Sequence, residues 1–374
     1  MVFSRLLTSE SLVGVDIGSS TIKIVRAESS KQGTRISNIA MCPTPAGAVK
    51  EGVIVGIPDV AAAIQFAIRS AGIKCSSAIA AIAGPGVIVR HVQMPKMTEQ
   101  VLRKTIQFEA GKYISASVED SVVEFEIIGD AAEEDQMNVI IVAAPKVMID
   151  TRVEALERTG LDPQAIDVEA FAALRALVEY NADPDLLEHT VALLDIGASH
   201  TEINLISKGN LALTRTIPIA GISITNALKN AENCSEAEAE QKKFSLDLSD
   251  VITPSDGTVP NQSLKVLQSL VDELLREIRR SINFYQSQLP EGAAETTISR
   301  LILTGGTSRL KGLVEYAKSR LNVEVSIGNP AIANMVDSAS TGHQLSEEDI
   351  PILTVAFGLA VKELPAGARL SIAA

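Results

Sequence analysis

Two segments of the chain follow the same pattern, and this repeat constrains the fold more than any other feature of the sequence. The first reads GVDIGSSTIKIV from Gly14, and the second reads LLDIGASHTEINLI from Leu193. In each, β-branched and aliphatic residues flank a short turn that contains aspartate, glycine and serine, which predicts a strand, a tight turn and a second strand. The repetition indicates a duplicated fold whose two turns face each other across a cleft.

Both turns have the residue types that bind phosphate groups. Glycine and small side chains let backbone N–H groups approach phosphate oxygens. An aspartate at the end of a strand can hold Mg²⁺ through water or orient a nucleophilic water. One copy would be a weak signal because Asp and Gly also form ordinary turns. Two copies, at Asp16 and Asp195, predict a phosphate clamp.

A third glycine motif completes this pattern. The segment RLILTGGTSRLKGLVEYAKSRL from Arg300 predicts a strand, a glycine pair at Gly305 and Gly306, and a helix whose N-terminus faces a ligand. Further on, TVAFGLAVKEL around Gly358 predicts a small-residue helix suited to close packing at a hinge.

Composition argues against several classes of function. The chain has 374 residues, so we expect two or more domains. Its net charge is −13, and without a dense run of Lys or Arg we expect no nucleic-acid partner. The cysteines and histidines lack metal-ligand or redox spacing, which favours a reducing compartment. We expect a cytoplasmic protein, because the sequence has no apolar run of membrane-spanning length and no secretory signal.

Two segments read as insertions beside the repeats. After Gly84 the sequence predicts a strand, a helix that begins after Thr98, a hairpin around an acidic loop, and a second helix. In the second half, SLKVLQSLVDELLREIRRSINFYQSQ from Ser263 places its apolar residues along one helical stripe. Such a stripe is typical of a helix that packs on a core.

The motifs resemble those of the actin-like ATPase superfamily, and within it the branch that contains the FtsA and PilM families. The segments most similar to the type IV pilus assembly PilM family are GVDIGSSTIKIV, IDVEAFAALRAL, EIRRSINFYQSQ, LILTGGTSRLKGL and LTVAFGLAVKE. The resemblance covers nearly the whole chain. It implies an α/β fold of two actin-like lobes, a duplicated ribonuclease H-like unit, with ATP and Mg²⁺ between the lobes and a small α+β subdomain inserted in the first.

The same resemblance implies a division of the chain into two lobes and two subdomains. The N-terminal lobe, its inserted subdomain, the second lobe and the second-lobe subdomain would be, in that order, residues 1–83 with 165–190, 84–164, 191–225 with 299–374, and 226–298.

The resemblance also implies roles for individual residues at the phosphate end of the site. Asp16 and Asp195 match the aspartates that orient Mg²⁺. The residues expected near the phosphates in the first loop are Gly18, Ser19, Ser20 and Lys23, and those in the second loop are Gly197, Ala198 and Ser199. His200 stands where the family commonly has another residue.

Other positions match the adenosine end of the family's site. Glu240 and Lys243, in AEQKK, would meet the ribose hydroxyls and the adenine, although a solvated charged helix is the alternative. The glycine-pair motif, matched by Gly305, Gly306 and Thr307, would also contact the adenosine, with Arg309 beside the base. Glu169 resembles the residue that positions the attacking water in active relatives; the alternative is a structural acid in a protein that binds ATP and barely hydrolyses it.

In function, the resemblance implies an ATP-binding cytoplasmic scaffold of type IV pilus assembly with weak or no ATPase activity. We expect it to lie at the inner membrane through protein partners, without inserting directly. The implied partner is the cytoplasmic N-terminal tail of the bitopic pilus protein PilN, and other pilus components and self-association stay open. We expect the tail to bind in a groove where the inserted subdomain meets the first lobe, with VIVRHVQMP and the helix after it as one wall.

Two other classes share the implied fold. A cell-division protein of the FtsA family attaches to membrane by a C-terminal amphipathic helix, whereas KELPAGARLSIAA has no apolar stripe flanked by Lys or Arg. A small-molecule kinase would use an aspartate as general base, and usually has a larger substrate-binding insertion.

Overall fold

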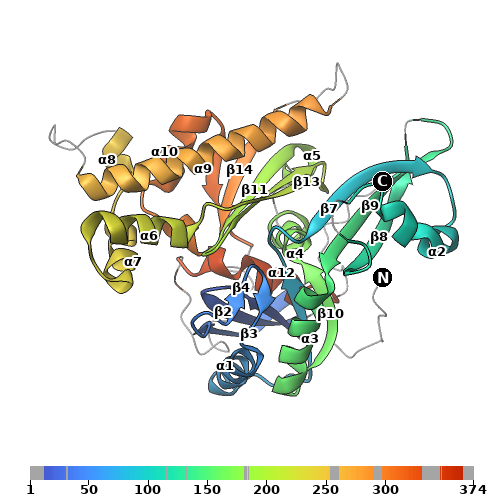
Figure 1. Ribbon diagram of the computed structural model, residues 1–374, viewed down its shortest axis with the longest axis horizontal. Coiled ribbons are helices and arrows are strands. Elements are labelled where there is room, and N and C mark those ends of the chain that lie inside the picture. Colours follow the sequence, from blue (N-terminus) through green and yellow to red (C-terminus); the bar gives the residue numbers. More distant parts are fainter. Residues whose placement is uncertain are drawn as a thin grey trace.

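The computed structural model describes residues 12–30, 33–114, 117–131, 133–180, 183, 185–252, 261–289, 297–330, 346 and 348–364. Two five-stranded sheets form the body of the molecule (Figure 1). The first sheet contains β1 (Leu12–Ile17), β2 (Thr21–Ser30), β3 (Gly33–Pro43), β6 (Ser77–Ile82) and β10 (Asp162–Val168). The second contains β11 (Thr190–Ile196), β12 (Thr201–Ser207), β13 (Asn210–Ile217), β14 (Arg300–Thr304) and β15 (Glu324–Ile327).

The two sheets share one strand order and one set of strand directions. The orders are β10-β6-β1-β2-β3 and, read from the equivalent edge, β15-β14-β11-β12-β13. In each sheet the first three strands form an antiparallel meander, and the other two extend it in parallel. This equivalence confirms the duplicated α/β fold that the repeated motifs predicted.

Helices cover the sheets on their outer faces. We call the first sheet with its helices the first lobe and the second sheet with its helices the second lobe. The first-lobe helices are α1 (Ile57–Ser70) and α3 (Lys146–Thr159), beside the short hairpin of β4 (Val49–Lys50) and β5 (Val53–Ile54). The second-lobe helices are α6 (Gly221–Glu232), α7 (Glu236–Ser245), α8 (Ser249–Ile252), α9 (Gln262–Ser287) and α10 (Leu313–Leu321), with α5 (Asp185–Glu188) at the sheet edge.

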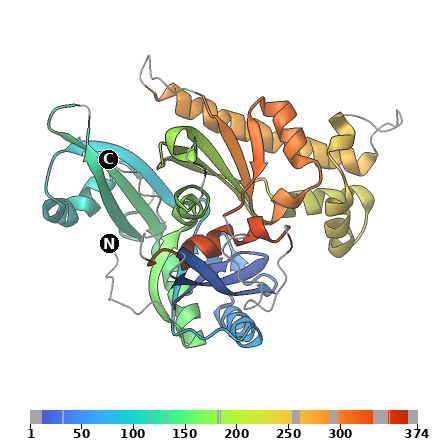
Figure 2. The ribbon, with the colours of Figure 1, turned by 180° about the vertical axis from the view of Figure 1, so that it is seen from behind.

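Helix α9 has the amphipathic pattern that its sequence predicted. Its buried face includes Leu267, Val271, Leu274 and Ile278, which join the core of the second lobe. The helix runs along the outer side of that lobe in both views (Figures 1 and 2). Among the described residues, no helix is both long enough and apolar enough to cross a bilayer.

A separate three-stranded sheet lies at the end of the molecule opposite α7 (Figures 1 and 2). Its strands are β7 (Ile88–Pro95), β8 (Ser121–Asp130) and β9 (Gln136–Pro145), antiparallel in the order β7-β9-β8. Helix α2 (Glu99–Ala110) begins after its predicted N-cap, Thr98, whose hydroxyl accepts a hydrogen bond from the Val101 N–H. Leu102 and Ile106 of α2 pack on one face of this sheet.

Helix α3, which our division assigned to the inserted subdomain, packs against α1 and the first sheet. The reason lies in its buried face, because Ala155 and Leu156 join the apolar core of the first lobe. The boundaries of the four parts stay a prediction.

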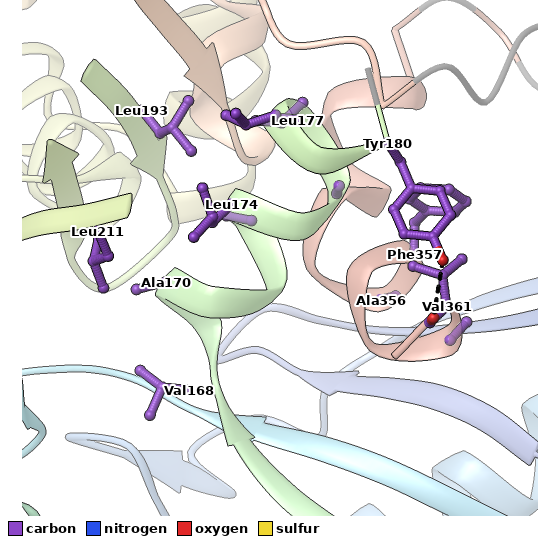
Figure 3. Close-up of a cluster of buried hydrophobic side chains, with 14 of the residues drawn as sticks. Val168, Ala170, Leu174, Leu177, Tyr180, Leu193, Leu211, Ala356, Phe357 and Val361 are labelled. Atoms are coloured by element: carbon purple, nitrogen blue, oxygen red, sulfur yellow. Dashed lines mark hydrogen bonds between the residues drawn. The ribbon is translucent and has the colours of Figure 1, made fainter. Parts of the chain in front are cut away.

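Two short helical segments lie between the lobes. The first is α4 (Glu169–Leu174), which continues as a π-helical turn over Arg175–Glu179, and the second is α12 (Thr354–Ala360), which follows a 3₁₀ turn over Ile350–Leu353. Figure 3 shows α4 with Leu193 and Leu211 of the second lobe on one side and α12 on the other. The Tyr180 and Phe357 rings meet edge to face at 6.1 Å, and the Tyr180 hydroxyl donates to the Val361 carbonyl.

Glycine permits the close approach of α12 to its neighbours. A Cβ atom at Gly358 would lie 1.9 Å from the Ala172 carbonyl oxygen of α4, and one at Gly14 of β1 would lie 2.2 Å from the Ala356 carbonyl oxygen. Real Cβ atoms do not approach backbone this closely, so α12 packs directly against both neighbours. The predicted close-packing helix is therefore present.

We expect Gly358→Ala to lower the free energy of unfolding by about 3 kcal/mol or more, because the added methyl group would push α12 away from α4. Urea unfolding followed by circular dichroism measures this change. Gly111→Ala is the matched control, since a Cβ there meets no atom closer than 3.5 Å. Equal stability of the two variants would contradict this close packing of α12.

Candidate interlobe nucleotide site

Strand pairing in each repeated hairpin sets one side chain opposite the motif aspartate. In the first lobe Lys23 of β2 pairs with Asp16 of β1, and in the second lobe Glu202 of β12 pairs with Asp195 of β11. The Lys23 Nζ lies 2.9 Å from Asp16 Oδ2. The lysine among the β-branched residues of the first motif is therefore the partner of its aspartate, and the second motif carries an acid in the equivalent place.

The Lys23 ammonium attracts carboxylates from both lobes. Burial disfavours its charged form, but Asp16, Asp195 and Glu169 outweigh this effect and raise the pKa of Lys23 above its ordinary value. Lys23 therefore stays protonated between β1, β11 and the first turn of α4. The structure brings together these four predicted residues from distant parts of the sequence.

Carboxylates at this site outnumber the nearby cations, and the pKa values of three of these carboxyl groups are raised. Burial raises the pKa of Asp195 to about 6, with Lys23 opposing and Asp16 adding to the shift. Burial and Asp195 raise the pKa of Glu202 to about 7, although hydrogen bonds from the Gly84 N–H and Asn204 oppose this. Burial and these neighbouring acids hold the pKa of Glu169 well above its usual range. A divalent cation would relieve this repulsion.

The donor set suits Mg²⁺ only in part. Carboxylate oxygens are ligands that Mg²⁺ prefers, and Mg²⁺ is usually held by one or two carboxylates together with water and phosphate oxygens. Within the described ranges, no group of three or more His, Cys, Asp or Glu side chains is placed to hold a metal ion. Asp16 and Asp195 therefore fit a metal that arrives with phosphate, and do not form a complete protein cage.

The two glycine turns present backbone donors. In the first, the Gly18 N–H donates to the Thr21 carbonyl at 3.2 Å, and a Cβ at Gly18 would lie 3.1 Å from the Lys23 Nζ. In the second, the Gly197 N–H donates to the His200 carbonyl at 3.1 Å. The described residues offer no hydrogen-bond acceptor to the four backbone N–H groups that follow these glycines, those of Ser19, Ser20, Ala198 and Ser199. This arrangement fits the predicted phosphate cradle.

The third glycine motif lies against the second turn. Gly305 has a φ of 84°, and a Cβ there would lie 2.2 Å from Asp195 Oδ1. The Thr307 hydroxyl donates to the Gly197 carbonyl at 2.8 Å. The predicted helix, however, does not begin after the glycine pair. A 3₁₀ turn over Gly306–Arg309 comes first, and α10 begins only after Gly312, whose φ is 70°. No α-helix N-terminus therefore follows Gly306 directly.

The predicted adenosine residues of α7 lie beside this motif. Helix α7 begins with a capping box between Ser235 and Glu238. The buried Lys243 Nζ donates to the Thr225 hydroxyl at 3.0 Å and to Glu240 at 2.7 Å. Gly221 lies between α7 and the glycine-pair motif, because a Cβ there would lie 2.6 Å from the Thr307 hydroxyl and 3.4 Å from the Lys243 Nζ. Glu240, Lys243 and Thr307 therefore share one side of the site.

The sequence analysis missed two residues of the interlobe site. Phe244 lies under both predicted cations, with the Lys243 Nζ 4.8 Å and the Arg309 guanidinium 5.1 Å from the ring centroid. Its only sequence signal was an aromatic residue directly after two lysines in a chain with few aromatics. The second is Glu202. A residue-by-residue alignment of the two motifs would have placed it at the position of Lys23, opposite the motif aspartate Asp195.

A groove of about 1080 Å³ lies outside this site. Its walls come from β8, β9, β10, α3, α4, the β12–β13 turn and the segment after α12. Alternation along β9 explains its apolar floor, because Ile141 and Ala143 face α2 whereas Ile140, Val142 and Ala144 line the groove. The expectation that VIVRHVQMP and the following helix form one wall is wrong for this groove, since β7 and α2 contribute no lining residue.

The comparisons with known proteins identify the family. The family model for the type IV pilus assembly protein PilM matches residues 14–364. The chain belongs to the PilM family. The structure of a PilM-PilN type IV pilus biogenesis complex is similar, with 27% sequence identity, a TM-score of 0.79, and coverage of 94% of this chain and 98% of that one.

More distant relatives share the fold. The ethanolamine utilization protein EutJ from Carboxydothermus hydrogenoformans has a TM-score of 0.56 at 18% identity over 93% of this chain and 88% of its own. The cell division protein FtsA of Pseudomonas aeruginosa is 27% identical over 85% of this chain and 83% of its own. Because the PilM family model spans nearly all described residues while FtsA is a distant relative, the FtsA alternative is not favoured.

We expect Glu202→Gln to stabilise the nucleotide-free protein at high pH. The folded-state pKa of Glu202 is raised to about 7 from 4.5, so the wild type loses stability as the pH rises through this window. The variant should be more stable than wild type by about 1 to 3 kcal/mol at pH 8, and nearly equal to it at pH 4.

Urea unfolding at both pH values, without nucleotide or Mg²⁺, measures this difference. The matched control is Glu273→Gln on the exposed face of α9. A gain in stability that is the same at pH 4 and pH 8 would show that the charge of Glu202 is not its cause.

Proposed function

We propose that this PilM-family protein is an ATP-binding cytoplasmic scaffold of the type IV pilus machinery, held at the inner membrane by the cytoplasmic tail of PilN. The observation that carries the proposal is the likeness to PilM from the PilM-PilN complex over nearly the full length of both chains. The interlobe site and the groove give this scaffold two separate binding regions.

The interlobe site supports ATP binding. The backbone N–H groups of the two turns, for which the described residues offer no acceptor, would bind the phosphates together with Lys23. Asp16 and Asp195 would hold Mg²⁺, which neutralises phosphate charge when bound. Glu240, Lys243 and Thr307, with the Gly305–Gly306 pair, would bind the adenosine, and Arg309 over Phe244 would flank the base.

Slow or absent hydrolysis fits the position of Glu169. This residue begins α4 and would be the group that positions the attacking water. Burial, Asp16, Glu202 and Asp195 all favour its protonated form. Below its raised pKa Glu169 carries a proton and cannot accept one from water, so slow hydrolysis is expected below that pKa.

The groove supports docking of an extended tail. Apolar side chains of β8, β9 and β10 line it, together with four acidic residues, Glu124, Glu126, Glu179 and Glu363. Its cations Arg175 and Lys362 both pair with Asp167, at 3.2 and 2.8 Å. In the described structure, β8 is also an edge strand that could pair with an extended peptide. A tail with apolar and basic residues fits this lining.

For the nucleotide, we expect Asp16→Ala and Asp195→Ala each to weaken Mg²⁺-dependent ATP binding by about tenfold or more and to leave the fold intact. Calorimetric titration with and without Mg²⁺ measures the effect. Asp150→Ala, at an exposed position of α3, is the control. Wild-type ATP affinity in both variants would sink the assignment of the site.

For the partner, we expect Val142→Asp, in the groove, to lower the affinity for a synthetic PilN tail peptide by about tenfold or more, because the bound tail would bury the new carboxylate. Fluorescence anisotropy measures this affinity. Val55→Asp, at an exposed position outside the groove, is the matched control.

The same variants test the location. Co-expression with full-length PilN should move the wild type and the control to the inner-membrane fraction, and should leave Val142→Asp behind. If the wild type instead sediments with protein-free lipid vesicles, anchoring by PilN is wrong and direct attachment is the better account.

A further inference from the structure

Arg152 is the largest fully buried side chain of the described structure, and none of the roles assigned to the interlobe site involves it. It lies on α3 with an exposed fraction of 2%. Its Nε donates to the Ala81 carbonyl at 2.6 Å, and its Nη1 donates to the carbonyls of Gly52 at 2.6 Å and Met148 at 3.1 Å. These are uncharged acceptors, and Arg152 forms no ion pair with any described carboxylate. A buried charge of this kind is costly unless something nearby favours it.

The strand register places this charge at the phosphate end of the site. Ala81, whose carbonyl accepts from Arg152, follows Ala80, which pairs with Val15 directly before Asp16, and Ala81 itself pairs with Asp167, two residues before Glu169. Burial lowers the pKa of Arg152, and the negative charges of Glu169 and Asp16 oppose that shift. This end of the first lobe faces the second lobe, because a Cβ at Gly84 would lie 3.9 Å from the His200 Cε1, and burial and the Arg152 charge both lower the pKa of His200. At the adenosine end, the Lys243 Nζ instead donates to Thr225 and Glu240 of the second lobe.

The other buried or part-buried cations of the site are already paired. Lys23 lies 2.9 Å from Asp16, and Lys243 lies 2.7 Å from Glu240. Arg152 is different because its three acceptors fix the guanidinium without neutralising it. It is a fixed positive charge near carboxylates that outnumber the cations of the site. A bound polyphosphate would add further negative charge there.

We propose that Arg152 is a positioning residue of the nucleotide site, whose buried charge favours the terminal phosphates of ATP and whose hydrogen bonds fix the wall formed by the β4–β5 turn, the end of β6 and α3. This inference rests on the proposed binding of ATP between the lobes. It predicts that Arg152 contributes more to binding as the number of phosphates increases, because each phosphate adds negative charge.

The test compares three variants of the full chain with the wild type. Arg152→Gln removes the charge and keeps an N–H donor, Arg152→Lys keeps the charge, and Arg158→Gln changes an exposed arginine of the same helix that pairs with Glu154 at 2.7 Å. Calorimetry gives the affinities for ATP, ADP and AMP in the presence of Mg²⁺. Ligand-induced shifts of the unfolding temperature give the same comparison if a variant is less stable.

We expect Arg152→Gln to bind ATP about tenfold more weakly, AMP within about twofold of wild type, and ADP in between. Arg152→Lys should stay within about threefold of wild type for ATP, and Arg158→Gln should bind all three nucleotides as the wild type does.

Several results would overturn the proposal. Unchanged ATP affinity in Arg152→Gln would do so, and so would an equal loss for all three nucleotides, because a merely structural role does not distinguish phosphate number. If Arg152→Gln does not fold, Arg152→Lys decides: retained ATP affinity supports the proposal, and a tenfold loss overturns it because the charge is still present. A wild type that binds no ATP would refute the proposed function itself, and this inference with it.

Discussion

The attraction between Lys23 and the carboxylates around it is the interaction on which the interlobe site depends. Asp16 and Lys23 come from the first lobe, Asp195 from the second, and Glu169 from the helix between them. Without the ammonium, these acids would lie close together in a partly desolvated space, and the buried Arg152 guanidinium alone among the described cations near Glu169 would offset their repulsion. The mutual position of the two lobes is therefore tied to one protonated amine and to the apolar contacts of α4 and α12.

Those apolar contacts depend on the smallest residues of the chain. Gly14 and Gly358 let β1, α12 and α4 approach at backbone distance. The π-helical turn after α4 adds a local irregularity where the chain leaves the interlobe core, and such turns are rare and often lie at functional sites. The close packing of α12 against β1 and α4 therefore fixes α4, the helix that begins with Glu169.

The sequence predicted the duplicated fold because a strand–turn–strand motif with a rare residue order occurred twice. The family resemblance assigned Glu240 and Lys243 of α7 to the adenosine; the structure shows these two side chains in contact, and their role toward adenosine stays a prediction. The sequence did not reveal Phe244 or Arg152, since their importance lies in contacts with residues distant in the chain. The groove that the structure shows is lined by β8 and β9 and not by the expected β7, because the order β7-β9-β8 and the packing of α2 depend on tertiary contacts that the sequence does not display. The start of α10 was misplaced because Gly312, and not the glycine pair, ends the preceding turn.

The two hairpins are equivalent in backbone and opposite in charge, since Lys23 and Glu202 occupy the same place in their pairs. This difference makes the halves non-interchangeable. A dimer of two first halves would hold two lysines already balanced by two aspartates, and a dimer of two second halves would crowd four acids with no cation among these positions. The mixed pair keeps one ammonium beside three carboxylates, so the equivalent backbones coexist with an unequal charge that leaves room for a bound divalent cation.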